Sequence, residues 1–238
     1  MNPAIYRFIE AASPYLALWL FFFSLVTAWR VVQRLRRGVE RVPDSVLFTE
    51  LPGLPIAALQ SICFVWAVVS ADWLSALLFV WWGPGFVAVA AIWMTAKRRG
   101  KPIDWHRYRY VISWLCKGCY VLYVGVFAWR GMFGAIFVLS AWIINDQVEK
   151  AFMSLDADRL RRTFDDIWLF RILYPAGLLV PWFATELSYR MLFAAYGTTL
   201  LLAWLCGVIY VARKGLLRVR PQDPSLLRNM VYFPKLRQ

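Results

Sequence analysis

Long runs of hydrophobic residues, separated by short polar segments, dominate the pattern along this chain. A helix needs about 20 predominantly apolar residues to cross the hydrocarbon core of a bilayer, and most of these runs approach that length. A membrane barrel would instead show short segments of alternating hydrophobic and polar residues. The pattern therefore predicts an all-α polytopic membrane protein with about seven transmembrane helices. The expected spans cover residues 13–29, 54–71, 73–95, 110–129, 131–147, 167–185 and 190–212.

Two of the polar segments have the pattern of amphipathic cytoplasmic helices. Residues 30–52 carry an apolar stripe with arginines opposite, which is typical of a helix on the membrane surface. Residues 145–166 contain no glycine or proline and place opposite charges four positions apart, as at Asp158 and Arg162. We expect this second segment to continue the preceding span as a helix, or to follow it after a short break. Residues 1–212 are then one transmembrane bundle, and residues 213–238 form a basic cytoplasmic tail.

The distribution of Lys and Arg along the chain predicts how the bundle is oriented in the membrane. The chain has 238 residues, 61% of them hydrophobic, and a formal net charge of +13. Most of its Lys and Arg residues fall in every second connecting segment, whereas the alternate segments hold only Arg7, Arg130 and Arg190. The positive-inside rule then predicts an outward-facing N-terminus and a cytoplasmic C-terminus. We expect a bacterial cytoplasmic (inner) membrane protein whose basic surface meets anionic lipids, and no nucleic acid as a partner.

The segment around Lys117 places a charge and two thiols inside an apolar run. Lys117 is expected about 10 Å below the cytoplasmic boundary, where its side chain can reach back to the headgroups or pair with an acid. Asp146 and Glu149 approach the same leaflet from the next span and are candidate partners. Cys116 and Cys119 are three residues apart on a helix, so they are either a redox pair beside a cation or small packing residues.

Two spans carry helix-breaking residues. Trp81–Gly85 contains the sequence WWGPG, and the span at 167–185 contains Pro175 and Pro181 after the intramembrane Arg171. Prolines kink helices, and the carbonyl groups that they release either line a cavity or bond to neighbouring helices. These breaks are the best indication of a pocket.

Basic residues next to the predicted spans are candidates for binding lipid headgroups. His106 is the only histidine of the chain, which argues against metal hydrolysis and haem ligation, so we expect no metal and no cofactor. The sequence contains no Gly-rich phosphate loop, no GxSxG elbow and no HExxH motif, which points away from an autonomous enzyme. The headgroup candidates are Arg34, Arg36, Arg37, His106, Arg107 and Arg109.

The leading hypothesis is a non-catalytic subunit or scaffold of a larger membrane assembly, of the secretion, conjugation or envelope-biogenesis type. It would dock other membrane subunits through the cytoplasmic helix and the tail. Two alternatives remain open: a small-molecule, ion or lipid transporter or channel, and an enzyme that modifies lipid headgroups. A homo-oligomer is also open. The candidate docking residues are Phe152, Leu155, Arg159, Arg161, Arg162, Asp165 and Asp166.

Overall fold

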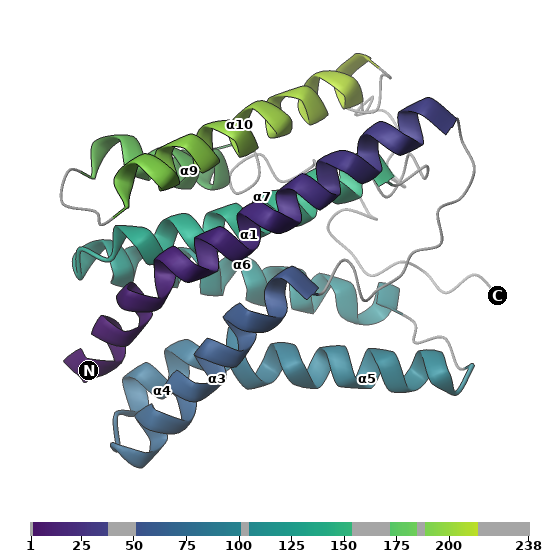
Figure 1. Cartoon of the computed structure of the whole chain (residues 1–238). Coiled ribbons are helices and arrows are strands. Elements are labelled where there is room, and N and C mark those ends of the chain that lie inside the picture. The colour runs from purple at the N-terminus through teal and green to yellow at the C-terminus, as the bar shows by residue number, and fades with distance from the viewer. Residues whose placement is uncertain (1, 38–50, 101–104, 154–171, 185–188, 214–238) are drawn as a thin grey trace, which may run out of the picture.

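The computed structural model describes residues 2–37, 51–100, 105–153, 172–184 and 189–213, and within these ranges every regular element is a helix (Figure 1). The elements follow in order as α1 (Pro3–Arg37), the 3-10 turn η1 (Leu51–Gly53), α3 (Leu54–Val69), α4 (Trp73–Phe79), the π-helical turn η2 (Trp81–Gly85), α5 (Phe86–Arg98), α6 (Trp105–Trp129), α7 (Phe133–Met153), α9 (Tyr174–Phe183) and α10 (Arg190–Arg213).

Three stretches of the described residues are long and apolar enough to cross a membrane. They are Pro3–Trp29, Trp73–Ala96 and Arg190–Ile209. Shorter apolar helices accompany them at Leu54–Val69, Leu115–Trp129 and Phe133–Asp146. The predicted all-helical fold is thereby confirmed for the described residues, and the three long apolar helices support the predicted membrane-protein class.

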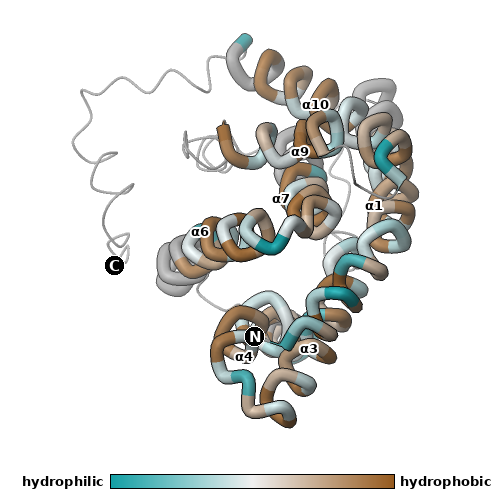
Figure 2. The backbone as a smooth tube through the Cα atoms, turned by 90° about the vertical axis from the view of Figure 1, so that its left-hand side faces the viewer, coloured by the Kyte–Doolittle hydropathy of each residue, from teal (hydrophilic) through white to brown (hydrophobic). Residues whose placement is uncertain are grey.

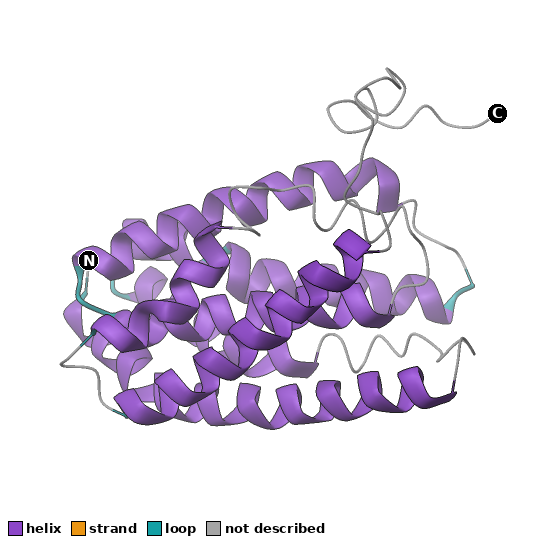
Figure 3. Ribbon diagram, turned by 90° about the horizontal axis from the view of Figure 1, so that it is seen from above, coloured by secondary structure: helices purple, strands orange, loops and turns teal. Residues whose placement is uncertain are grey.

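Helix α7 is the centre of the bundle. It packs against α1, α6, α9 and α10, and Figure 2 shows it lying among these helices when the bundle is seen end-on. Every residue from Gly134 to Asn145 is buried, which fits a stretch that is apolar on all sides. A second group, formed by α3, α4, η2 and α5, packs mainly on itself and meets α1 through α3. The helices run back and forth along one long axis (Figure 3).

Helix α1 is much longer than the predicted span 13–29. It begins at Pro3, a residue suited to the first turn of a helix, and the side chain of Asn2 accepts a hydrogen bond from the backbone N–H of Ala4 at 3.0 Å. At its other end, α1 continues without a break to Arg37, through the first part of the predicted surface helix 30–52. Residues 38–50 lie outside the described part of the chain.

The predicted break at Trp81–Gly85 is confirmed. Pro84 has no N–H group, and the carbonyl of Val80 instead accepts a bond from Gly85, five residues later, at 2.8 Å. Gly83 has non-helical dihedral angles of φ −91° and ψ −107°. A Cβ atom at Gly83 would lie 2.8 Å from the backbone of Gln60, so the absence of a side chain allows η2 to pack directly on α3.

Candidate functional site

Most of the predicted docking residues lie outside the described part of the chain, and so does Arg171. Phe152 falls within α7, but its side chain is not among those described. The residues outside the described ranges are Leu155, Arg159, Arg161, Arg162, Asp165, Asp166 and Arg171. The docking surface of the cytoplasmic helix therefore stays a prediction.

The predicted headgroup residues lie on helix ends that the backbone brings to one end of the bundle. Arg34, Arg36 and Arg37 occupy the last turns of α1, and His106, Arg107 and Arg109 the first turns of α6 (Figure 1). Their side chains are outside the described part. Arg98 and Arg99, at the end of α5, are exposed at this same end.

The two cysteines of the CxxC pair lie on α6 and are half-buried. The indole N–H of Trp81 donates a hydrogen bond to the Sγ atom of Cys116, with 3.3 Å between nitrogen and sulfur. This contact joins the kinked turn η2 to α6 and gives Cys116 a packing role. A redox role for Cys116 and Cys119 stays a prediction.

Lys117 and Asp146 lie at similar depths on the α6–α7 hairpin. At 1.5 Å per residue, Lys117 precedes the end of α6 at Trp129 by about 18 Å, and Asp146 follows the start of α7 at Phe133 by about 20 Å. Both residues are half-buried. The hairpin thus brings the predicted cation and its candidate acid to the same level, and their pairing remains a prediction.

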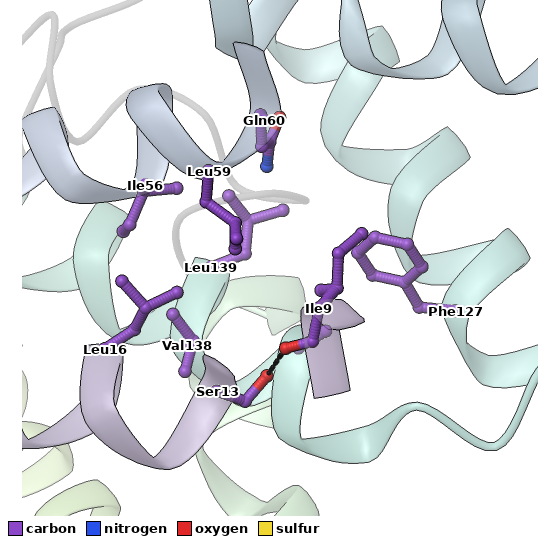
Figure 4. Close-up of a pocket in the computed structure, with 10 residues that line it drawn as sticks. Ile9, Ser13, Leu16, Ile56, Leu59, Gln60, Phe127, Val138 and Leu139 are labelled. Carbon is purple, nitrogen blue, oxygen red and sulfur yellow. Dashed lines mark hydrogen bonds between the residues drawn. The ribbon is translucent and has the colours of Figure 1, made fainter. Parts of the chain in front are cut away.

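A buried amide, which sequence reasoning missed, lies where α1, α3, α6 and α7 meet. Gln60 is 6% exposed, and its Oε1 atom accepts a hydrogen bond from the hydroxyl of Tyr123 at 2.5 Å. Next to it is a cavity of about 20 Å³ that Ser13 also lines, with apolar residues around both (Figure 4). The only sequence signal was a single amide in the apolar run of span 54–71.

A second missed group is Glu10, which lies within the span Pro3–Trp29. Its carboxylate faces the backbone N–H groups of Gly134 and Ala135, in the first turn of α7. The N-terminus of a helix has free N–H groups and a partial positive charge, so it suits an anion. The Oε2 atom of Glu10 is buried and has no hydrogen-bond partner among the described residues.

A polar contact also joins the described part of the predicted span 167–185 to the core. The hydroxyl of Tyr120 lies 2.8 Å from Ser140 Oγ and donates to the carbonyl of Leu173, just before α9, at 3.3 Å. Gly177 permits this approach, because a Cβ atom there would lie 2.0 Å from Ser140 Oγ. The carbonyl of Leu173 is thus bonded to a side chain of α6.

At the end of the bundle that holds the N-terminus, polar side chains clasp the helix turns. Asp72 caps α4 by accepting hydrogen bonds from the backbone N–H and the hydroxyl of Ser75, and it also accepts one from the backbone N–H of Asn2. Burial opposes ionisation of this carboxyl, but these hydrogen bonds outweigh it and hold the pKa of Asp72 below its usual value. The Tyr6 hydroxyl lies 3.3 Å from Ser75 Oγ, and the Arg130 guanidinium lies 5.0 Å from the centre of the Tyr6 ring.

With this geometry in place, comparison with known proteins gives no relative. No protein-family model matches the chain, and neither a curated protein nor a solved structure matches it. Within the described ranges, no group of three or more His, Cys, Asp or Glu side chains is placed to hold a metal ion. The functional interpretation therefore starts from the contacts of the chain itself.

Proposed function

We propose that this chain is a non-catalytic integral membrane subunit that anchors a larger assembly. The observation that carries the proposal is the use of the buried polar groups. Gln60 bonds to Tyr123, and Tyr120 bonds to Ser140, so these groups hold helices of the same chain together. A bundle held together in this way is suited to a fixed structural role.

The size of the cavity beside Gln60 supports the same function. Its volume of about 20 Å³ is enough for about one water molecule, whereas pockets for small-molecule ligands measure about 300–1,000 Å³. In this conformation the space between α1, α3, α6 and α7 does not admit a substrate.

The proposal includes seven membrane crossings in a bacterial inner membrane, with the N-terminus outside. The crossings would be α1, α3, the kinked α4–η2–α5 unit, α6, α7, α9 with the residues before it, and α10. Their alternating directions bring the turns at Ser70–Asp72 and Arg130–Met132 to the end that holds the N-terminus (Figure 1). The basic helix ends collect at the opposite end, which would be cytoplasmic.

The test of the anchoring function is co-purification. The tagged chain is extracted gently from its own cells, and the bound proteins and lipids are identified by mass spectrometry. We expect a stoichiometric set of protein partners. The double variant Arg161→Glu/Arg162→Glu should release them without changing the thermal unfolding of the bundle, because it reverses charge on the predicted docking helix only.

The matched control is Arg98→Glu/Arg99→Glu, which reverses two exposed charges at the end of α5. This variant should keep the partners, since any general effect of cytoplasmic charge would appear in both proteins. Partners that stay bound to the Arg161/Arg162 variant would contradict docking through this helix. A chain that purifies alone would contradict the proposed function itself.

A transporter or channel is the second candidate, and two observations favour it. The π-helical break at Trp81–Gly85 interrupts the candidate span Trp73–Ala96. Inside the candidate span Pro3–Trp29, the Oε2 atom of Glu10 is buried and has no hydrogen-bond partner among the described residues. Ionisable groups within spans commonly mark ion or proton pathways. A ligand that raises the thermal unfolding temperature of the wild type, but not of Lys117→Ala, would favour transport over anchoring.

A further inference from the structure

We propose that Arg130, in the turn between α6 and α7, binds the phosphate group of a membrane lipid at the end of the bundle that holds the N-terminus (Figure 1). The headgroup candidates from the sequence all lie at the opposite end. The inference goes beyond the anchoring function and does not depend on it. It needs only that this end of the bundle meets the surface of a leaflet.

The turn that carries Arg130 is closed by its own backbone. The N–H of Gly131 donates to the carbonyl of Ala128 at 3.0 Å, and the N–H of Met132 donates to the carbonyl of Phe127 at 2.8 Å. Gly131 has a φ of 71°, so these bonds form the Schellman arrangement that ends many helices. The carbonyl groups at the end of α6 are thereby satisfied without the side chain of Arg130.

The turn between α9 and α10 shows a different use of arginine. There the guanidinium of Arg190 donates to the carbonyl groups of Pro181 and Trp182. The described contacts of Arg130 are instead with the faces of aromatic rings, and its side chain has no hydrogen bond or ion pair with another described residue. Its N–H donors are therefore not used by the described part of the chain.

Two aromatic rings position this guanidinium. Its central carbon lies 5.0 Å from the centre of the Tyr6 ring and 5.8 Å from the centre of the Trp129 ring. Tyr6 is 4% exposed and its hydroxyl lies 3.3 Å from Ser75 Oγ, so packing and polar contacts hold this ring in place on α1. A guanidinium on a ring face keeps its N–H groups at its edge, where their fork matches the oxygen atoms of a phosphate group.

A carboxylate near the same tyrosine does not occupy these donors. Asp72 accepts hydrogen bonds from Ser75 and from the backbone N–H of Asn2, and none of its described hydrogen bonds comes from Arg130. The guanidinium thus keeps its donors for an anion from outside the described chain.

The tryptophans of this end indicate that the anion belongs to a lipid. Trp129 is the last residue of α6 and is 80% exposed, and Trp73 at the start of α4 is 68% exposed at the same end of the bundle. Indole rings of membrane proteins concentrate at the level of the lipid headgroups. The phosphate groups of lipids lie in this layer, so the Trp129 ring places Arg130 within their reach.

The test is photo-cross-linking of the full chain in vesicles. The reporter is Phe133→p-benzoylphenylalanine, which replaces one aromatic side chain by another at a position that is 37% exposed and close to Arg130 in the sequence. The vesicles contain equal parts of phosphatidylethanolamine and digalactosyldiacylglycerol with the same acyl chains. Both lipids have no net charge, and only the first has a phosphate group.

We expect phosphatidylethanolamine to be enriched about fivefold in the adduct at residue 133, which corresponds to about 1 kcal/mol, the scale of one arginine at a membrane surface. Arg130→Gln in the reporter chain should return the adduct to the lipid ratio of the vesicle. The matched control is Arg7→Gln, which removes another exposed charge at this end and should keep the enrichment. No enrichment in the reporter chain, or an equal loss in both variants, would overturn the proposal.

Arg130→Lys tests the guanidinium itself, and it keeps the charge of the turn if the glutamine variant fails to fold. It should lose most of the enrichment, because an ammonium group lacks the planar fork, and full retention would overturn the assignment to a stacked guanidinium. Millimolar inorganic phosphate separates a lipid from the free ion. Enrichment that persists in its presence supports the lipid as the ligand, and its loss would overturn that assignment.

Discussion

At the scale of single residues, packing inside this bundle depends on positions that lack a side chain. Gly177 lets α9 lie directly on Ser140, and a Cβ atom there would sit 2.0 Å from the serine oxygen. Gly125 on α6 is exposed, and a Cβ atom there would meet no other atom within 4 Å. The same substitution should therefore have opposite effects at the two positions.

We expect Gly177→Ala to destabilise the protein by about 1–3 kcal/mol, because the methyl group overpacks the α7–α9 contact and disturbs the Tyr120–Ser140 bond. Gly125→Ala should stabilise it by roughly 0.5–1 kcal/mol, because alanine favours the helix and meets open space. Thermal unfolding in detergent, followed by tryptophan fluorescence, measures both. Equal shifts in unfolding temperature for the two variants would contradict the described α7–α9 contact.

The clasp at Asp72 predicts a dependence of stability on pH. Hydrogen bonds lower the pKa of Asp72 in the folded protein. In the unfolded chain its pKa is the ordinary value for an aspartate, about 3.9. The ionised carboxylate therefore stabilises the fold above about pH 4, and this contribution is lost as the pH falls through the folded-state value.

Asp72→Asn should accordingly unfold at a lower temperature than the wild type at pH 7. Its unfolding temperature should also fall less between about pH 4 and pH 2. The measurement is a series of thermal unfolding curves over that pH range. Parallel acid profiles for the two proteins would show that the clasp does not contribute in its ionised form.

At the scale of elements, Arg190 joins the start of α10 to the end of α9. Its Nε atom donates to the carbonyl of Pro181 at 3.1 Å, and its Nη2 atom donates to that of Trp182 at 2.7 Å. The C-terminal carbonyls of a helix need such donors, and α9 ends at Phe183 after a proline. One guanidinium at the start of α10 therefore closes the end of α9.

Arg190→Ala should destabilise the protein by about 1–2 kcal/mol through these lost bonds. Arg190→Lys should recover only part of the loss, because an ammonium group cannot reach both carbonyls with the fixed fork of a guanidinium. Unfolding temperatures of the three proteins decide the matter. Full recovery by lysine would mean that charge, not the paired hydrogen bonds, matters at this turn.

The helix boundaries show how far the sequence could predict the elements. The predicted spans 54–71 and 190–212 differ from α3 and α10 by at most two residues, because turns with polar residues bound them. The start of α1 was missed by ten residues, since Arg7 and Glu10 have the composition of a flank. The Glu10 carboxylate faces the first turn of α7, and a local pattern cannot report such a distant contact.

The buried polar groups were harder to predict for the same reason. Gln60 and Tyr123 are isolated polar residues in apolar runs, and nothing in either run indicates that they bond to each other. The break at Trp81–Gly85 was predictable because proline and glycine act locally. The hydrogen bond from Trp81 to Cys116 was not predictable, although both residues belong to motifs described from the sequence.

At the scale of the whole molecule, the proposed orientation makes a labelling experiment decisive. The four native cysteines are first replaced, and single cysteines are introduced as Ser70→Cys, in the turn between α3 and α4, or as Arg99→Cys, after α5. Both positions are exposed. In intact bacterial cells that express the chain, a membrane-impermeant maleimide should label Ser70→Cys only. Labelling of Arg99→Cys alone would reverse the orientation, and labelling of both would contradict an odd number of crossings between them.

The contact between Glu10 and the first turn of α7 also has a consequence for biosynthesis. More than a hundred residues separate Glu10 from Gly134, so α1 enters the membrane long before its covering helix has been made. Until α7 arrives, we expect the Glu10 carboxylate to lack this cover. Chains that stop before residue 133 should therefore be held back at the insertion site or degraded, and Glu10→Leu should relieve this delay. On this expectation, the acidic side chain would make completion of the bundle a condition for release.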